Sequence, residues 1–225
     1  MIYKVLIFVF SVGCYAAPQQ QNHANREFIR PCYLNDYNCI RDNLAANSKC
    51  NKNVVGWIPS AYMIKTFRFE TPFFNASYID NNLVVRNHHN CRIAEFFYNV
   101  KKDSAVLAVE CRGLVVSSNR TLIQHNTFKE DSIYSYSSTW EYPIIRMTTH
   151  IRNANRMDVC NSFVYTDVAA MPKFVLNPND KQTANFLSKD LSYLNIYERE
   201  TFFYRGFGLF HRFISSIICN FGCYY

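Results

Sequence analysis

The cysteines constrain this chain more than any other feature, once the compartment in which it folds is known. The chain has 225 residues and nine cysteines, and the first, Cys14, ends an apolar run that starts at Val5. A positively charged start, this run and the small residues Ala16 and Ala17 follow the order of a secretory signal, and the run is too short to span a bilayer. We therefore expect residues 1–16 to be a signal peptide and the mature protein to be secreted into the extracellular space.

Secretion gives the remaining cysteines a defined meaning. Cys14 leaves with the signal peptide, so eight of the nine cysteines remain, an even number in an oxidising compartment. Such a set predicts up to four disulfides, whose connectivity the sequence does not determine. Spacing assigns only Cys32–Cys39, which brackets a polar turn before a helix, while Cys91–Cys111 would suit two neighbouring strands. The eight cysteines are Cys32, Cys39, Cys50, Cys91, Cys111, Cys160, Cys219 and Cys223.

Zinc is the alternative to disulfides. The sequence has no Cys-x2-Cys pair, and His88, His89 and Cys91 alone do not supply the four ligands of a structural zinc site. We therefore expect no metal.

The sequence contains none of the common linear motifs for catalysis or cofactor binding. It lacks G-x-S-x-G, H-E-x-x-H, a P-loop and G-x-G-x-x-G, and its six histidines are dispersed. We expect a protein that is not an enzyme and holds no cofactor. A catalytic group assembled from distant residues stays open as an alternative.

The charge balance limits the class of partner. The net charge of +7 becomes +6 when Lys4 leaves with the signal, and the basic residues are scattered without a run of five like charges. We expect no nucleic-acid partner and no membrane association, and we interpret most of these cations, including Arg120, as solvated surface. A basic secreted protein leaves an acidic protein partner open.

Two sequons predict glycosylation. They are Asn75-Ala-Ser77 and Asn119-Arg-Thr121. In a secreted chain each is a glycan acceptor that must face solvent, and an unused sequon is the alternative.

Hydrophobic periodicity predicts helices at both ends of a sheet. Residues 17–30 are polar and aperiodic, which indicates a flexible N-terminal arm before a single domain over residues 31–225. A short helix is expected between Leu34 and Cys50, capped by Asp36. Residues 62–176 carry the alternation typical of antiparallel strands. The expected strands are 64–70, 82–87, 92–100, 104–116, 121–128, 132–136, 143–151, 159–165 and 174–176.

Two amphipathic helices are expected after the sheet, separated by a break at Gly206–Gly208. Leu187, Leu191 and Leu194 share one helical face, and the second helix repeats the pattern from Phe210. We expect both helices to pack on the sheet. The alternative is that phenylalanines exceed what one face buries and form a docking surface for a partner; these are Phe202, Phe203, Phe207, Phe210 and Phe213.

Several sequence segments carry a family resemblance. They include Arg30–Asp36 (RPCYLND), Phe67–Pro72 (FRFETP), Asn177–Asp180 (NPND) and Ile218–Cys223 (ICNFGC). These segments resemble the fibrohexamerin family, glycoproteins that accompany the fibroin chains of lepidopteran silk, over about Arg30 to Cys223.

The resemblance implies a role in assembly. It implies non-covalent association with disulfide-linked fibroin heavy and light chains, internal disulfides, and help with secretion of a large soluble complex. Hydrophobic contact is the implied mode of binding. The family sequon expected near residues 137–141 is missing, which leaves open a silk subunit or a divergent paralogue.

A weaker likeness covers the first third of the chain. Cys32, Cys39 and the segment Gly56–Pro59 are similar to the start of juvenile-hormone-binding and takeout proteins, in which a long helix lies along a strongly curved antiparallel sheet. This likeness implies an alternative function as carrier of a small apolar ligand. The expected fold is therefore α+β, with a short N-terminal helix, a curved antiparallel sheet and C-terminal amphipathic helices packed on it.

Overall fold

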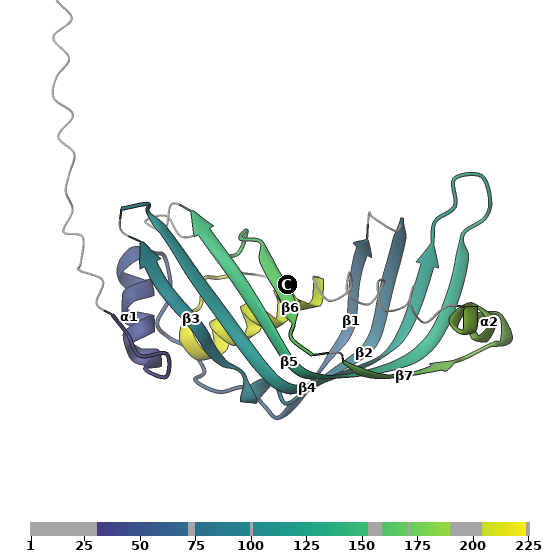
Figure 1. Ribbon diagram of the computed structural model, residues 1–225, viewed down its shortest axis with the longest axis horizontal. Coiled ribbons are helices and arrows are strands. Elements are labelled where there is room, and N and C mark those ends of the chain that lie inside the picture. The colour runs from purple at the N-terminus through teal and green to yellow at the C-terminus, as the bar shows by residue number, and fades with distance from the viewer. Residues whose placement is uncertain are drawn as a thin grey trace, which may run out of the picture.

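A bent antiparallel sheet forms the frame of the molecule in the computed structural model (Figure 1). The structure describes residues 31–71, 75–99, 101–152, 159–170, 172–189 and 204–223. The expected signal peptide (1–16) and arm (17–30) lie outside these residues. The described strands are β1 (Ala61–Thr71), β2 (Ala76–Arg86), β3 (Arg92–Asn99), β4 (Ser104–Gln124), β5 (Ser132–Arg152), β6 (Val164–Val168) and β7 (Lys173–Pro178).

The strand order is β1-β2-β4-β5-β6, with β3 beside β4 and β7 beside β5. The described helical elements are α1 (Tyr37–Asn47), η2 (His88–Asn90), α2 (Lys181–Lys189), a helix at residues 204–213 and its π-helical continuation η4 (Ile214–Ile218). This arrangement confirms the α+β class and the curved antiparallel sheet. No helix among the described residues has the length and apolarity needed to cross a membrane.

The N-terminal helix begins as its sequence predicts. The Asp36 carboxylate accepts a hydrogen bond from the Cys39 amide at 3.0 Å, which satisfies one of the free N–H groups at the start of α1. The predicted inner face of α1 is buried, with Ile40 and Leu44 in the main core.

The two longest strands correct the predicted breaks. The segments expected as four strands, 104–116, 121–128, 132–136 and 143–151, fall in only two, β4 and β5, which pair with each other along their whole length. Residues 125–128 lie in the turn between them and not in a strand. The polar residues Ser117–Arg120 lie between two of the expected strands. They stay in the strand because Ser118 and Arg120 find buried hydrogen-bond partners there.

The sheet bends at the point where, in both β4 and β5, the inward-facing side chains change from one set of alternate residues to the other. The β4 residues of the main core are odd-numbered up to Cys111 and even-numbered from Leu114 onward, and β5 makes the matching change around Pro143. Gly113 lies at this point with φ +62°, a left-handed conformation that favours glycine. Figure 1 shows the two strands bending near their middle.

Two apolar clusters lie along the inner side of the bent sheet. The larger cluster holds residues of α1 and η4 and strand residues from the first half and the middle of β4, such as Leu107 and Leu114. The smaller cluster joins Tyr78, Leu122 and Tyr136 to Leu187 of α2. Leu191 and Leu194, expected on the same helix, lie outside the described residues.

A buried charge cluster separates the two apolar clusters. Along β2, β4 and β5 the inward residues change from apolar to polar at Asp80, Ser118, Arg120 and Ser138, and then return to apolar. Arg120 binds both oxygens of Asp80, at 2.8 Å and 3.0 Å, and Ser118 donates to the same carboxylate. Arg205, from the C-terminal helix, donates to Asp80 Oδ2 at 2.8 Å. Arg120 is 1% exposed, so its assignment to the solvated surface is wrong.

The C-terminal helix packs on the sheet through the phenylalanines that were candidates for docking. Phe210 and Phe213 are 0% and 2% exposed and belong to the main core, so the alternative of a docking surface is wrong for these two. Phe207 is half-buried, and Phe202 and Phe203 lie outside the described residues. The packing of this helix on the sheet is confirmed.

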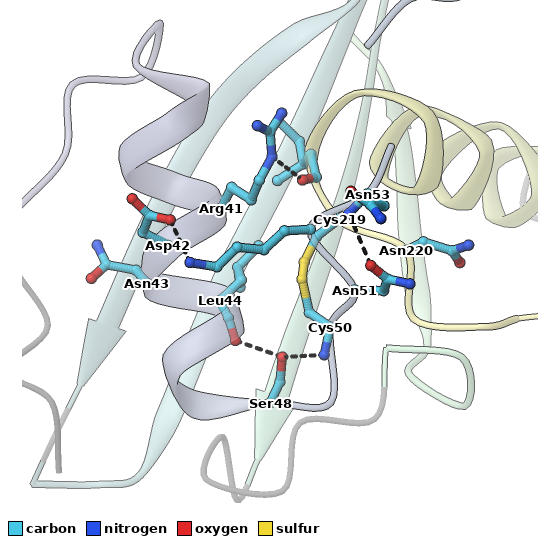
Figure 2. The surroundings of a disulfide bond; sticks show 12 residues. Arg41, Asp42, Asn43, Leu44, Ser48, Cys50, Asn51, Asn53, Cys219 and Asn220 are labelled. Atoms are coloured by element: carbon cyan, nitrogen blue, oxygen red, sulfur yellow. Dashed lines mark hydrogen bonds and ion pairs between the residues drawn. A yellow bond between two sulfur atoms is a disulfide. The ribbon is translucent and has the colours of Figure 1, made fainter. Parts of the chain in front are cut away.

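Four disulfides pair the eight cysteines expected in the mature chain. The bonds are Cys32–Cys39, Cys50–Cys219, Cys91–Cys111 and Cys160–Cys223. The two pairs assigned or suggested by spacing are both present. Figure 2 shows how Cys50–Cys219 links the segment after α1 to the end of η4, beside an Asn51–Asn220 bridge. Arg41 donates to the carbonyls of Ile217 and Ile218 at the same junction, which satisfies the end of that helix.

Replacing Asp80 should destabilise the fold strongly. Asp80→Asn leaves Arg120 and Arg205 buried without their shared carboxylate, so the free energy of unfolding should fall by about 3–5 kcal/mol. Urea unfolding followed by circular dichroism measures the change. Asp42→Asn is the matched control, because its ion pair with Lys52 is exposed and screened and should contribute little. Equal stability of the two variants would contradict the structural importance of the cluster.

Candidate functional site

A half-open groove runs between β1 and the C-terminal helix. Its volume is about 1030 Å³, and apolar and aromatic side chains form most of its wall. The strand side includes Tyr62, Ile64 and Phe69, and the helix side includes Tyr204 and Leu209. Because β1 and the helix are more than a hundred residues apart in the sequence, only the fold brings the two walls together.

The strand wall follows the outer edge of β1. Successive side chains of a strand point to opposite faces of its sheet. The groove nevertheless contacts consecutive residues, first at 62–64 and then at 66–69. Contact with both faces of β1 shows that the groove reaches the edge of this strand, and Leu83, Val85 and Val116 extend it over the inner face of the sheet. β1 pairs with β2 alone among the described strands, so no described strand pairs with the backbone groups of its other edge.

Stacked aromatic rings form the floor at one end of the groove. Tyr204 lies over Phe69 with 5.6 Å between ring centroids, and Phe69 lies over Tyr78 at 4.9 Å with the two planes 4° apart. The Arg120 guanidinium lies 5.3 Å from the Tyr78 ring and is held there by Asp80. The charge cluster thus fixes the rings that shape this end of the groove.

Two glycines define the helix wall, and they do not break the helix. Residues 204–213 are continuously helical, so the break predicted at Gly206–Gly208 is wrong. A side chain at Gly206 would collide with Thr166 of β6, so glycine there allows close packing of the helix on the sheet. At Gly208, which lines the groove, an added Cβ would meet nothing within 4 Å. The free space at Gly208 therefore belongs to the groove.

The charged residues of the groove wall are all cations. Arg68, Arg205 and Arg212 line it, and no carboxylate is among the described lining residues. Arg205 is occupied by Asp80, whereas Arg68 and Arg212 are exposed. The Arg212 guanidinium lies 3.9 Å from the centroid of the Tyr62 ring, which orients it by a cation–π contact.

A buried tyrosine–histidine pair supports this wall from beneath. The Tyr62 hydroxyl lies 2.8 Å from Nδ1 of His88, which is fully buried in η2 and packs near Phe213. Burial, with the Arg212 cation as second cause, lowers the pKa of His88 from 6.5 to about 4, so the ring is neutral at ordinary pH. Burial also raises the pKa of the Tyr62 hydroxyl, so this group stays protonated.

The position where zinc could be considered offers no free thiolate. His88, Cys91 and Cys111 bring their ligand atoms within 4.8 Å of one another. Both sulfurs are, however, joined in a disulfide and are unavailable as thiolate ligands.

The sequons lie on exposed positions. Asn75 precedes β2 and Asn119 lies on the outward face of β4, and both residues are exposed. Within the first sequon, the hydroxyl of Ser77 lies 2.7 Å from Nε2 of His125, whose Nδ1 lies 2.8 Å from Asp131. This Ser–His–Asp order, absent from the sequence predictions, ties the exposed β4–β5 hairpin to β2 outside the groove. We assign it a structural role.

The chain was compared with family profiles, curated proteins and solved structures. The profile of the family described as Fibroin P25 matches residues 28–223. The curated protein Fibrohexamerin of Galleria mellonella is 56% identical over 221 residues, covering 98% of this chain and 99% of that protein. Among solved structures, Epiphyas postvittana Takeout 1 matches with a TM-score of 0.49 and 13% identity, covering 83% of this chain and 94% of its own.

The buried histidine predicts a defined pH dependence of stability. Between pH 6.5 and pH 4 the unfolded chain binds a proton at His88 that the folded chain does not, so stability should fall as the pH falls through this window and level off below it. The pKa difference corresponds to about 3 kcal/mol. His88→Asn keeps a polar group near Tyr62 but cannot titrate, and urea unfolding between pH 7 and pH 4 should show a reduced slope. The exposed neighbour His89→Asn is the control and should keep the wild-type slope; an unchanged slope in His88→Asn would contradict the prediction.

Proposed function

The chain belongs to the fibroin P25 family of silk-associated proteins, and from this premise we propose that it is a secreted glycoprotein that binds fibroin heavy and light chains without a covalent bond. In this role it assists the assembly and secretion of the silk complex. It acts by binding and not by catalysis. The 56% identity to a fibrohexamerin over nearly the whole of both chains is the observation that carries the proposal.

The disulfide pairing supports the non-covalent mode. All eight cysteines of the expected mature chain are paired within the chain, so none of them is left to link a fibroin chain. Four internal disulfides are also typical of proteins that fold in an oxidising secretory compartment, which supports secretion.

The groove supports binding through apolar contact. Phe210 and Phe213 serve the core and not a docking surface. The aromatic and aliphatic wall between β1 and the C-terminal helix offers concave apolar surface in their place, with Phe207 contributing to it. Exposed concave apolar surface of this kind marks protein or ligand binding sites.

Carriage of a small apolar ligand is the second candidate function. The groove volume of about 1030 Å³ lies at the upper end of the roughly 300–1,000 Å³ found for small-molecule sites. Mass spectrometry of the protein under native conditions, purified without detergent, would show a bound lipid if this function were the correct one. An empty protein that recovers fibroin chains would favour the first proposal.

The fibroin complex should be released by denaturant alone. We expect the tagged protein to recover fibroin heavy and light chains from silk-gland secretion, and 6 M urea without reductant should release it from both. Reductant without denaturant should not, because the proposed contact contains no disulfide. Gel electrophoresis of each eluate measures the release. A complex that separates only after reduction, or no recovery of fibroin, would contradict the proposal.

Both sequons should carry glycans. Asn75→Gln and Asn119→Gln should each lower the mass of the secreted protein by one glycan, because both acceptor residues are exposed. Intact mass before and after endoglycosidase treatment measures the change. Asn161→Gln is the control, since Phe163 at the third position prevents acceptor function. A wild-type mass equal to that of the bare mature chain would show that neither sequon is used.

A further inference from the structure

We propose that the free edge of β1 is the docking site for an extended, acidic segment of a fibroin chain, whose side chains enter the groove beside it. The inference rests on the proposed function and specifies its partner segment and its mode of binding. The segment would pair its backbone with β1 and place apolar side chains against the aromatic wall.

The unpaired edge supplies the backbone half of this site. An edge strand presents a row of N–H and C=O groups that can pair with another extended chain. β1 has eleven residues, and its described ladder uses only the side that faces β2. The groove contacts residues 62–64 and 66–69, so an apolar channel runs directly along this row.

The length of the channel fits a short extended peptide. Residues 62–69 of β1 span roughly 23 Å at about 3.3 Å per residue, so an added strand of about seven residues would occupy it. Alternate side chains of such a strand would point toward Phe67, Phe69 and Tyr204, which line the groove. This geometry favours an extended chain over a compact ligand.

The charges select an acidic segment. Arg68 and Arg212 are exposed on opposite walls, and the described lining contains no carboxylate. The whole chain carries a net charge of +7, so an acidic segment is also attracted at longer range.

The same charges disfavour a second copy of this chain as the occupant. Antiparallel pairing of two β1 edges in the register that places Lys65 opposite Arg68 would bring these exposed cations of both copies together. Like charges at facing strand positions are destabilising. Lys65 and Arg68 therefore protect the edge from self-association while leaving it open to an acidic partner.

Gly208 allows the groove to be filled without disturbing the fold. A Cβ added at Gly208 would meet nothing within 4 Å. The backbone there is helical, so a residue with a higher helix propensity than glycine should favour the helix. Gly208→Phe should fill the groove and weaken binding of the purified fibroin complex at least tenfold. Gly208→Ala makes the same backbone change with little added volume and should weaken binding much less than Gly208→Phe.

A charge reversal on β1 provides an independent variant. Arg68→Glu should weaken binding several-fold, and the loss should shrink at high salt because screening weakens the interaction. Lys65→Glu makes the same charge change on the same strand at an exposed position outside the groove lining. It should have a clearly smaller effect. Thermal unfolding of all four variants, each expected to melt close to the wild type, tests that they are folded.

Hydrogen exchange of the wild-type protein tests the site directly. Peptides covering residues 62–69 should exchange at least several-fold more slowly when the fibroin complex is bound, because an added strand protects edge amides. A complex that forms without protecting these residues, and that Gly208→Phe binds as well as the wild type, would overturn the inference and leave the proposed function standing. If the wild type binds no fibroin, the proposed function fails and the inference fails with it. A lipid found in the groove by native mass spectrometry, with fibroin bound elsewhere, would also overturn it.

Discussion

The buried Asp80 carboxylate is the interaction on which the rest of this structure depends. It joins β2, β4 and the C-terminal helix at a polar stretch of the inner face, between two apolar clusters. A carboxylate and two guanidinium groups removed from water are costly to bury, and the cost is offset only when their geometry is well satisfied. The bidentate contact with Arg120 and the donations from Ser118 and Arg205 meet that requirement. The cluster therefore fixes how the helix lies on the sheet.

The shape of the groove depends on how the Asp80 cluster places the C-terminal helix on the sheet. Arg205 holds the start of the helix at Asp80, and its neighbour Tyr204 stacks on Phe69 of β1. At the other end of the helix, Cys50–Cys219 and the donations from Arg41 fix η4 against α1 (Figure 2). A helix secured at both ends cannot close onto β1 without breaking these contacts. The space between them can thus persist as an open site in the folded protein.

Local signals predicted the local structure, and the rest depended on contacts distant in sequence. The cap at Asp36, the short disulfide Cys32–Cys39 and the alternation in β1 involve neighbours within a few residues, so periodicity and spacing were sufficient. Cys50–Cys219 closes a separation of 169 residues and follows only from the topology. The prediction that Arg120 is solvated was wrong because the sequence alone does not show that Asp80 lies beside it. Gly206 was misread as a break because close packing on Thr166 leaves no local signal.

The candidate site could not be predicted from the sequence, because its two walls are far apart in the chain. Its charges can be understood from the tendency of exposed sheet edges to aggregate. An apolar edge strand in a concentrated secretory protein invites aggregation, and charged side chains on the edge are a common protection. Here the protection is cationic, at Lys65 and Arg68, and the opposite wall adds Arg212. Positive charges that repel a second copy of the same edge also attract an acidic strand. Protection from self-association and selection of a partner are then two consequences of the same residues.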